Sequence, residues 1–295
     1  MEDRKVILKI EHLCKDFDIK AKSFTGKALK LHALSDISLD IYQGETLGII
    51  GESGCGKSTL GRCLVNLHPI TSGKLVYDGK ELNRLRKKER QALSREIQMV
   101  FQDPYSSLDP RHTAADSVEE PMIVHKTPAT ARERQERTIG LFKEVGLDMQ
   151  HLNRYPHEFS GGQRQRLNIA RAIASNPRVV ICDEPVSALD VSIQAQVINL
   201  FKKLQKHFNL TYIFISHDLS VVRYICDRIM VMYLGNVMEI ADKKALYEDA
   251  KHPYTQALLS AIPIPDMDIE YNKIHLEGDV PSPFNPPQGC RFHTR

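Results

Sequence analysis

The sequence predicts an α/β fold with a mostly parallel sheet, and three observations support this prediction. Short apolar runs rich in β-branched residues alternate with segments of helical periodicity. The composition, 42% hydrophobic and 26% charged over 295 residues, is that of a globular protein. The stretch from about Thr113 to Ser175 carries no strand signal, which predicts a helical insertion. Such a chain forms one large domain or two smaller ones.

The individual elements follow from local patterns. Thr46 to Ile50 predicts a short apolar strand, which leads through a glycine-rich turn into a helix over Ser58 to Asn66. A strand over Lys74 to Tyr77 runs into Asp78-Gly79, a hairpin signal. The other predicted elements are three buried strands at Ile97 to Phe101, Val179 to Cys182 and Thr211 to Ser216, and a helix with one apolar face at Ser192 to Phe208.

Four segments lack a buried pattern. Asp18 to Lys30 is lysine-rich and predicts an exposed loop, and Asp103 to Pro110 carries turn residues. The proline-rich stretch from Pro263 to Pro287 should wrap over a surface. The basic segment from Arg84 to Arg95 predicts a solvated helix face rather than a nucleic-acid site.

Charge and composition exclude several classes of protein. The chain has 40 Lys and Arg against 37 Asp and Glu, a net charge of +3, and its pI is about 8.4, so it lacks the strong positive charge of nucleic-acid binders. No apolar run approaches the roughly 20 residues that span a bilayer, and the N-terminus does not resemble a secretory signal. The six cysteines contain no C-x-x-C pair, which predicts reduced thiols.

A phosphate-binding pattern lies between the first predicted strand and its helix. Residues 51–58, Gly-Glu-Ser-Gly-Cys-Gly-Lys-Ser, fit G-x-x-x-x-G-K-[ST]. Glycines allow the backbone to aim N–H groups at phosphate oxygens, and the helix N-terminus adds its positive dipole end. Lys57 can then bridge two phosphates, and the Ser58 hydroxyl can bind Mg²⁺. The alternative is an ordinary glycine-rich turn.

Polar residues follow three other predicted strands. Asp183 and Glu184 end a buried strand, where the carboxyl edge of a parallel sheet binds ligands. We expect Asp183 to hold Mg²⁺ and Glu184 to activate water, the alternative being an exposed acidic pair before a turn. His217 can bond a γ-phosphate oxygen, and Gln102 can reach Mg²⁺ and the attacking water. Taken alone, each could be structural.

A further motif, Ser160-Gly161-Gly162-Gln163, stands directly before a predicted helix. Together with the phosphate-binding pattern and the polar strand ends, which all follow in the family's order, it makes the chain similar to the ATP-binding subunits of ABC transporters. The resemblance covers essentially the whole chain. It implies a P-loop NTPase (RecA-like) core of ABC ATPase type, with an antiparallel β subdomain and a helical insertion. The implied domains are an ATP-binding core at 1–102 and 178–240, a helical signature subdomain at 103–177, and a C-terminal extension at 241–295.

The resemblance also implies roles for single residues. In this family two subunits dimerise head to tail, so that each ATP lies between one phosphate loop and the partner's Ser-Gly-Gly-Gln segment. The implied signature and dimer-seam residues are Ser160, Gly161, Gly162, Gln163 and Asp190. The implied ATP-binding residues are Phe17, stacking on adenine, and Gly51, Glu52, Ser53, Gly54, Cys55, Gly56, Lys57, Ser58 and Thr59. The implied catalytic residues are Glu184, His217 and Gln102, and the implied Mg²⁺ ligands are Ser58, Gln102 and Asp183.

Finer motifs resemble the oligopeptide and dipeptide importers. Phe101-Gln102-Asp103-Pro104 and His252-Pro253-Tyr254-Thr255 look like motifs of this branch. Within it, the Pro-Val-Ser-Ala-Leu-Asp run at 185–190 looks like that of the second, F-type ATPase subunit. The implied partners are a related D-type ATPase subunit, two transmembrane permease subunits and, indirectly, an extracytoplasmic peptide-binding protein, with no nucleic acid. The implied location is the cytoplasmic face of the cell membrane, and the implied cofactors are ATP and Mg²⁺.

One departure concerns the C-terminal end. Relatives of this branch often continue after Cys290 with further cysteines that bind an iron–sulfur cluster, and such clusters need four ligands. Because Cys290 is the one cysteine of that motif in this sequence, we expect no iron–sulfur cluster in this chain. The chain is then either truncated or lacks the site. Three alternatives to a peptide importer stay open: a cassette ATPase that acts on nucleic acid or ribosomes, a non-catalytic regulatory cassette, and an importer of another solute such as nickel.

Overall fold

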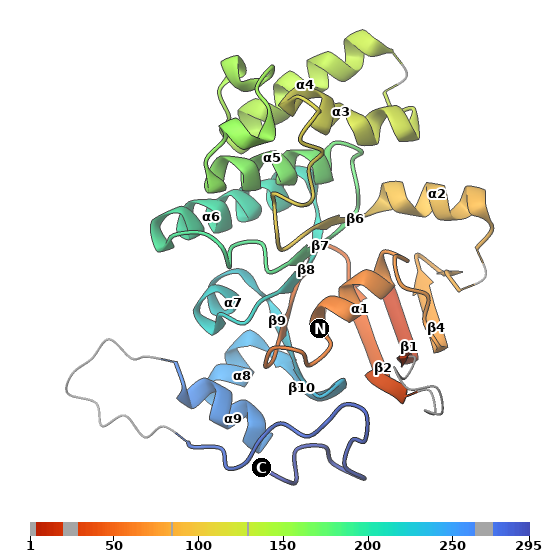
Figure 1. Ribbon diagram of the computed structural model, residues 1–295, viewed down its shortest axis with the longest axis vertical. Helices are drawn as coiled ribbons and strands as arrows, with labels where there is room; N and C mark the ends of the chain where they lie inside the picture. Colours follow the sequence, from red (N-terminus) through yellow and green to blue (C-terminus); the bar gives the residue numbers. More distant parts are fainter. Residues whose placement is uncertain (1–3, 20–28, 84, 129, 263–273) are drawn as a thin grey trace, which may run out of the picture. The chain divides into compact units, whose positions relative to one another are not determined.

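The computed structural model describes residues 4–19, 29–83, 85–128, 130–262 and 274–295 (Figure 1). The chain forms two units. Unit 1 consists of Met1–Arg84 and Ser216–Arg295, and unit 2 of Leu85–Ile215. The chain therefore enters unit 2 once and returns to unit 1 at Ser216.

An antiparallel sheet of order β2-β1-β4-β5 occupies the first part of unit 1. Its strands are β1 (Val6–Ile19), β2 (Leu29–Tyr42), β4 (Ser72–Tyr77) and β5 (Lys80–Glu81). The predicted turn joins β4 to β5, with Asp78 and Gly79 at φ 45° and 80°, as a two-residue hairpin requires. The loop predicted from Asp18 to Lys30 was too long, because Asp18 pairs with Lys30 and Ile19 with Leu29. Residues 20–28 lie outside the described part of the chain.

A second group of strands in unit 1 carries the phosphate-binding pattern. The fully buried β3 (Thr46–Ile50) is parallel to β9 (Arg228–Tyr233), which is antiparallel to β10 (Asn236–Asp242). The predicted strand over Thr46 to Ile50 is confirmed. The helices of unit 1 are α1 (Lys57–Leu64), α7 (Leu219–Ile225), α8 (Lys243–Glu248) and α9 (Pro253–Ser260).

Unit 2 contains three parallel strands, as the alternation of elements predicted. β6 (Ile97–Val100) pairs with β7 (Val179–Asp183), and β7 pairs with β8 (Thr211–Ile215). Between β6 and β7, the described residues form helices and turns, and α3, α4 and α5 pack on one another (Figure 1). The helices of unit 2 are α2 (Lys87–Glu96), α3 (Ala114–His125), α4 (Ala131–Val145), α5 (Gly161–Ile173) and α6 (Val191–Phe208), with 3₁₀ turns at Met149–His151 and Pro156–Glu158.

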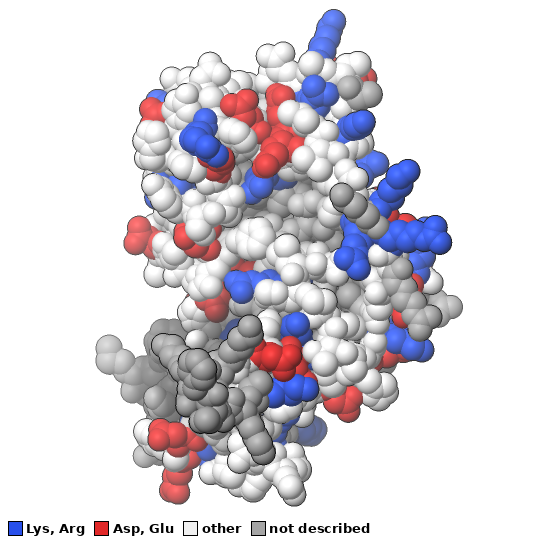
Figure 2. Space-filling model, turned by 45° about the vertical axis from the view of Figure 1, so that its right-hand side comes forward, with Lys and Arg blue, Asp and Glu red and all other residues white. Residues whose placement is uncertain are grey.

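The surface reflects the near balance of charges. In Figure 2 basic side chains gather at one margin of the face drawn, and elsewhere blue and red side chains are interspersed. The basic segment predicted as a solvated face overlaps α2 and includes its N-cap, Arg86, which is exposed together with Lys88 and Arg90. Among the described residues, we find no helix with the length and apolar character needed to cross a membrane.

Candidate functional site

The glycine-rich loop runs from the end of β3 to the start of α1, as predicted. Gly51, Gly54 and Gly56 adopt φ values of 151°, 77° and 104°, which residues with a side chain rarely adopt. A Cβ on Gly51 would lie 2.1 Å from the carbonyl oxygen of Met232, and one on Gly56 would lie 2.6 Å from that of Ala33. The loop thus has the tight backbone turn that a phosphate cradle requires.

Lys57 is buried and binds backbone carbonyl groups of this loop. Its side chain is 5% exposed, and its ammonium group donates hydrogen bonds to the carbonyl oxygens of Gly51 (2.8 Å) and Glu52 (2.9 Å). Ser58 and Thr59 follow in the first turn of α1, whose start at Gly56 receives no side-chain cap. A buried cation and the amides of an uncapped helix start are suited to phosphate, so this loop fits a nucleotide.

Glu52, a residue of the loop, has two partners outside the loop that the sequence patterns did not indicate. Its carboxylate accepts hydrogen bonds from the Arg295 guanidinium, with both oxygens 3.0 Å from Nη1. Its backbone N–H donates to the hydroxyl of Tyr254 at 3.0 Å. These partners lie more than 200 residues away along the chain, and no local pattern indicates such pairs.

The other loop residues differ in exposure. Ser53 and Gly54 are exposed, whereas Cys55 is buried. Burial raises the pKa of the Cys55 thiol above its ordinary value, because the thiolate would lose its hydration. The loop therefore presents a neutral thiol next to Lys57.

His217 lies in unit 1, beside the strand that leads into the loop. The N–H of Ser216 donates to the carbonyl oxygen of Ile49 in β3 at 3.2 Å, which places this turn near the carboxyl end of β3. Asp218 caps α7 and accepts from the N–H of Ser220 at 2.8 Å. The exposed His217 is thus held between two anchored neighbours.

In unit 2 the structure brings Gln102 and Glu184 together. The side-chain amide Nε2 of Gln102 donates to Oε2 of Glu184 at 3.1 Å. Asp183 ends β7 and is 1% exposed, and Glu184 follows with φ 46°. A left-handed backbone is uncommon for glutamate and is found at functional sites. The N–H of Glu184 donates to the carbonyl oxygen of Ile215 at 3.0 Å, which ties this turn to β8.

The signature segment forms the start of α5. Ser160 is the N-cap: its hydroxyl accepts from the N–H of Gln163 (3.3 Å), and its own N–H donates to the Gln163 side chain (3.0 Å). A Cβ on Gly162 would lie 2.6 Å from Cγ2 of Ile193 in α6. Gly161 has more room, and the exposed Asp190 is the N-cap of α6. Glycine at 162 therefore permits close packing of α5 on α6, a reason that the sequence did not indicate.

Phe17 lies in β1 and is partly exposed. The Lys15 ammonium stands 4.6 Å from the centre of its ring, and the His68 ring meets it edge-on at 5.4 Å. Neither neighbour was predicted. They hold the aromatic ring at the surface of unit 1, and its stacking on adenine stays a prediction.

Two family models match the chain. The first, described as "ABC transporter", matches residues 34–187, and the second, described as "Oligopeptide/dipeptide transporter, C-terminal region", matches residues 238–295. The first match includes the phosphate loop, Gln102, the signature segment and Asp183-Glu184. The second includes α8, α9 and the C-terminal residues that contact Glu52.

Named relatives match along nearly the whole chain. The oligopeptide transport ATP-binding protein OppF of Haemophilus influenzae is 50% identical, over 99% of this chain and 90% of its own length. AppF of Bacillus subtilis, also an oligopeptide transport ATP-binding protein, is 51% identical with the same coverage. The di/tripeptide transport ATP-binding protein DppF of Pseudomonas aeruginosa is 46% identical, over 98% of this chain and 89% of its own length.

Solved structures share the fold. The ATP-binding cassette MJ0796 bound to ADP and Pi is 31% identical, with a TM-score of 0.72, over 80% of this chain and 99% of that one. The cbiO1 subunit of Clostridium perfringens is 29% identical, with a TM-score of 0.70, over 83% and 91%. These likenesses confirm the predicted ABC ATPase fold. Together with the matched family models and relatives, they show that this chain belongs to the ABC transporter family, as one of its ATP-hydrolysing subunits.

Proposed function

We propose that this chain powers the import of oligopeptides or dipeptides by hydrolysing ATP at the cytoplasmic face of the cell membrane. The observation that carries the proposal is the C-terminal match at residues 238–295 to a region described for oligopeptide and dipeptide transporters. The names of the relatives point to the same solutes. The alternative is an importer of a different solute, such as nickel.

Residues of the loop and of the strand ends bind the nucleotide in this proposal. The backbone of 51–59 and the Lys57 ammonium bind the phosphates, and Phe17 stacks on the adenine ring. Ser58, Gln102 and Asp183 are the residues that would hold Mg²⁺, an ion that prefers oxygen ligands. A bound Mg²⁺ would supply positive charge against the phosphates of ATP.

Glu184 activates the attacking water as the general base. A positioned base of this kind contributes about 10²- to 10⁴-fold to the rate. The 3.1 Å hydrogen bond from Gln102 orients one oxygen of the Glu184 carboxylate. His217 donates a hydrogen bond to the γ-phosphate, whose charge is also neutralised by Lys57.

The functional unit is a dimer that works with membrane partners. We assign Ser160, Gly161, Gly162, Gln163 and Asp190 to the surface that meets the nucleotide of a partner ATPase, and we propose a D-type subunit as that partner. The helical subdomain at 103–177 contacts two permease subunits, and 241–295 forms the extension of the peptide-importer type. ATP binding closes the dimer, and hydrolysis opens it.

Glu184→Gln tests the catalytic assignment. The amide keeps the size and hydrogen-bonding capacity of the side chain but is a far weaker base, so we expect the complex to bind ATP normally and to release phosphate at least about 100-fold more slowly. The matched control is Glu133→Gln, at an exposed carboxylate that caps α4. Hydrolysis by the Glu184 variant at the wild-type rate would contradict the role.

Transport by the assembled importer tests the solute. The chain is reconstituted with its ATPase partner, both permeases and the binding protein in vesicles. Uptake of a labelled tripeptide that requires ATP, and that is lost with Glu184→Gln, is the expected result. ATP-dependent uptake of Ni²⁺ without any peptide uptake would refute peptide import while leaving the ATPase assignment intact.

A further inference from the structure

The C-terminal residues 274–295, here called the strap, belong to unit 1 although they form neither helix nor strand. One anchor is on β2, where the N–H of His32 donates to the carbonyl oxygen of Pro283 at 3.1 Å. Near its end the strap carries Arg291 and Phe292, which are 9% and 7% exposed. Burial of an arginine requires partners, so its contacts identify where the strap is fixed.

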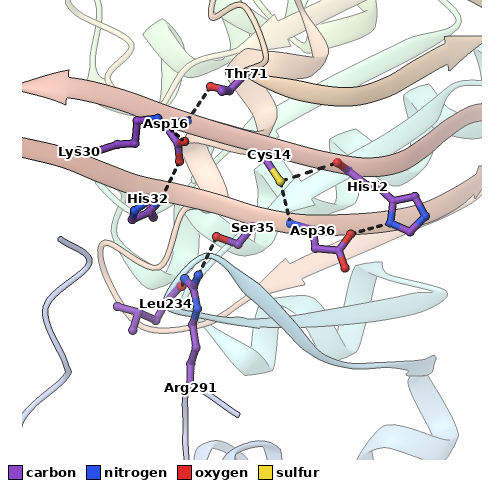
Figure 3. A network of polar contacts seen from close by, with 10 residues as sticks. All are labelled: His12, Cys14, Asp16, Lys30, His32, Ser35, Asp36, Thr71, Leu234 and Arg291. Atoms are coloured by element: carbon purple, nitrogen blue, oxygen red, sulfur yellow. Dashed lines mark hydrogen bonds and ion pairs between the residues drawn. The ribbon is translucent and has the colours of Figure 1, made fainter. Parts of the chain in front are cut away.

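Arg291 bonds to a turn that contacts the phosphate loop. Its guanidinium donates to the carbonyl oxygen of Leu234 and, at 2.7 Å, to the hydroxyl of Ser35 (Figure 3). Leu234 and Gly235 form the tight turn between β9 and β10, with φ 46° and 79°. The N–H of Gly235 donates to the carbonyl oxygen of Cys55 in the loop at 2.9 Å. The strap therefore reaches the loop through one intervening turn.

Arg295 reaches the phosphate loop directly. Its side chain is 11% exposed where it pairs with both oxygens of Glu52, whose side chain is 28% exposed. Phe292 packs on Tyr254 with ring centres 5.3 Å apart, and the hydroxyl of Tyr254 accepts from the N–H of Glu52. Glu52 is thus held by its side chain and by its backbone, both times through the C-terminal part of the chain.

The charge of Glu52 gives this contact a consequence for nucleotide binding. A carboxylate inside a loop that binds a polyanion repels the phosphates, and the repulsion is large where solvent is partly excluded. The Arg295 guanidinium compensates this charge and limits the movement of the glycine-rich backbone. A loop already fixed in one conformation loses less entropy when it binds its ligand.

We propose that the strap positions the phosphate loop for ATP, with Arg295 acting through Glu52 and Arg291 acting through the turn at 234–235. Arg295 and Arg291 are positioning residues, because they act through other groups rather than on the nucleotide. The proposal rests on the ATPase activity of the chain and is independent of the transported solute. It makes ATP affinity a property of the C-terminal extension as well as of the motifs.

Arg295→Gln in the full chain tests the proposal. We expect the Kd of a fluorescent ATP analogue to rise roughly 5- to 20-fold, the size of a typical coupling between sites. Arg295→Lys should retain part of the affinity, because it keeps the charge but loses the planar fork. Arg132→Gln, at an exposed arginine paired with Glu136 on α4, removes the same charge and should leave the Kd unchanged. A Kd of Arg295→Gln equal to that of the wild type would overturn the proposal. Because the wild-type chain would still bind the ATP analogue in the same experiment, this result would not affect the proposed ATPase function.

A second substitution separates charge compensation from mere loss of structure. Adding Glu52→Gln to Arg295→Gln removes the uncompensated carboxylate, so we expect the double variant to bind the analogue more tightly than Arg295→Gln alone. If the double variant binds as weakly as Arg295→Gln or more weakly, charge compensation through Glu52 is refuted. In the assembled transporter, the KM for ATP should rise with Arg295→Gln while kcat stays within about twofold; a fall in kcat at constant KM would refute positioning of the bound nucleotide.

Reciprocity gives a readout on the strap itself. If the strap favours ATP binding, ATP must favour the docked strap by the same factor. Amide hydrogen exchange in residues 274–295 should therefore slow when ATP is added to the wild-type chain. It should respond much less in Arg295→Gln, provided that circular dichroism shows the variant to be folded. Exchange that is insensitive to ATP in the wild type would contradict the coupling.

Discussion

Single glycines set how closely the backbones of this protein approach one another. At Gly51 and Gly56 the reason is a left-handed backbone together with a carbonyl group in the space of a side chain. At Gly162 the backbone is helical, and the reason is the Ile193 side chain on α6. The first kind of constraint is visible as a sequence motif, whereas the second depends on Ile193, 31 residues further along the chain.

Gly162→Ala should destabilise the packing of α5 on α6. The new methyl group would lie 2.6 Å from Cγ2 of Ile193, a β-branched side chain with little rotamer freedom. Overpacking of this kind costs about 1–3 kcal/mol, so the urea midpoint of the variant should fall. A midpoint equal to that of the wild type would show that α6 moves away without cost.

A glycine elsewhere in unit 2 provides the control for that measurement. Gly140 lies in α4 and is exposed, and apart from its own stretch of helix backbone no atom lies within 4 Å of the position that a Cβ would take. Gly140→Ala should therefore stabilise the protein by about 0.5–1 kcal/mol, through helix propensity alone. If the free energy of unfolding falls for Gly162→Ala and rises for Gly140→Ala, the loss at Gly162 is caused by the contact with Ile193 and not by the change from glycine to alanine.

At the scale of elements, the strands were the most predictable part of the molecule. The strands predicted at Thr46 to Ile50, Val179 to Cys182 and Thr211 to Ser216 agree with β3, β7 and β8 to within a residue at their ends. Such strands are buried on both faces, so they appear in the sequence as continuous runs of apolar residues. The strands β1 and β2 were not predicted, and the loop expected from Asp18 to Lys30 includes their exposed ends, where Asp18 pairs with Lys30 and Ile19 with Leu29.

The start of α5 carries a prediction about the partner subunit. Ser160→Arg places a long, charged side chain at the exposed N-cap that we assign to the partner's nucleotide. Because the variant keeps its own phosphate loop in unit 1, we expect ATP binding to the isolated chain to stay within about twofold of wild type. ATPase activity of the assembled pair should fall at least about tenfold, since donors aimed at the phosphates contribute several kcal/mol to the transition state.

Thr130→Arg is the matched control for the α5 variant. Thr130 is the exposed N-cap of α4 and forms the same kind of capping box, with Glu133. The substitution costs a cap, about 1 kcal/mol, without touching the signature segment. Equal losses of activity in both variants, or full activity of Ser160→Arg, would contradict the assigned surface.

At the scale of the whole molecule, the sequence indicated the site motifs but not what supports them. Lys57, Asp183 and Glu184 were recognised because each stands at a fixed distance from a strand of clear periodicity. Arg291 and Arg295 had no such signal, since their partners lie between 57 and 256 residues away. A long-range ion pair depends on the folded path of the chain, and a single sequence does not encode that path in any local pattern.

The cysteines test burial across both units in one experiment. Cys55, Cys63, Cys182 and Cys226 are buried, Cys14 is partly exposed, and Cys290 is exposed. Only the thiolate reacts with alkylating reagents, and burial raises the pKa of Cys63 to about 11, which leaves about one thiolate in a thousand at pH 8. Mass spectrometry after brief treatment of the native chain with iodoacetamide should find Cys290 modified first, Cys14 more slowly and the buried four unmodified. In urea all six should react at similar rates. Rapid native modification of Cys55 would show that the phosphate loop opens to solvent, and it would contradict the fixed loop on which nucleotide binding by this chain is proposed to depend.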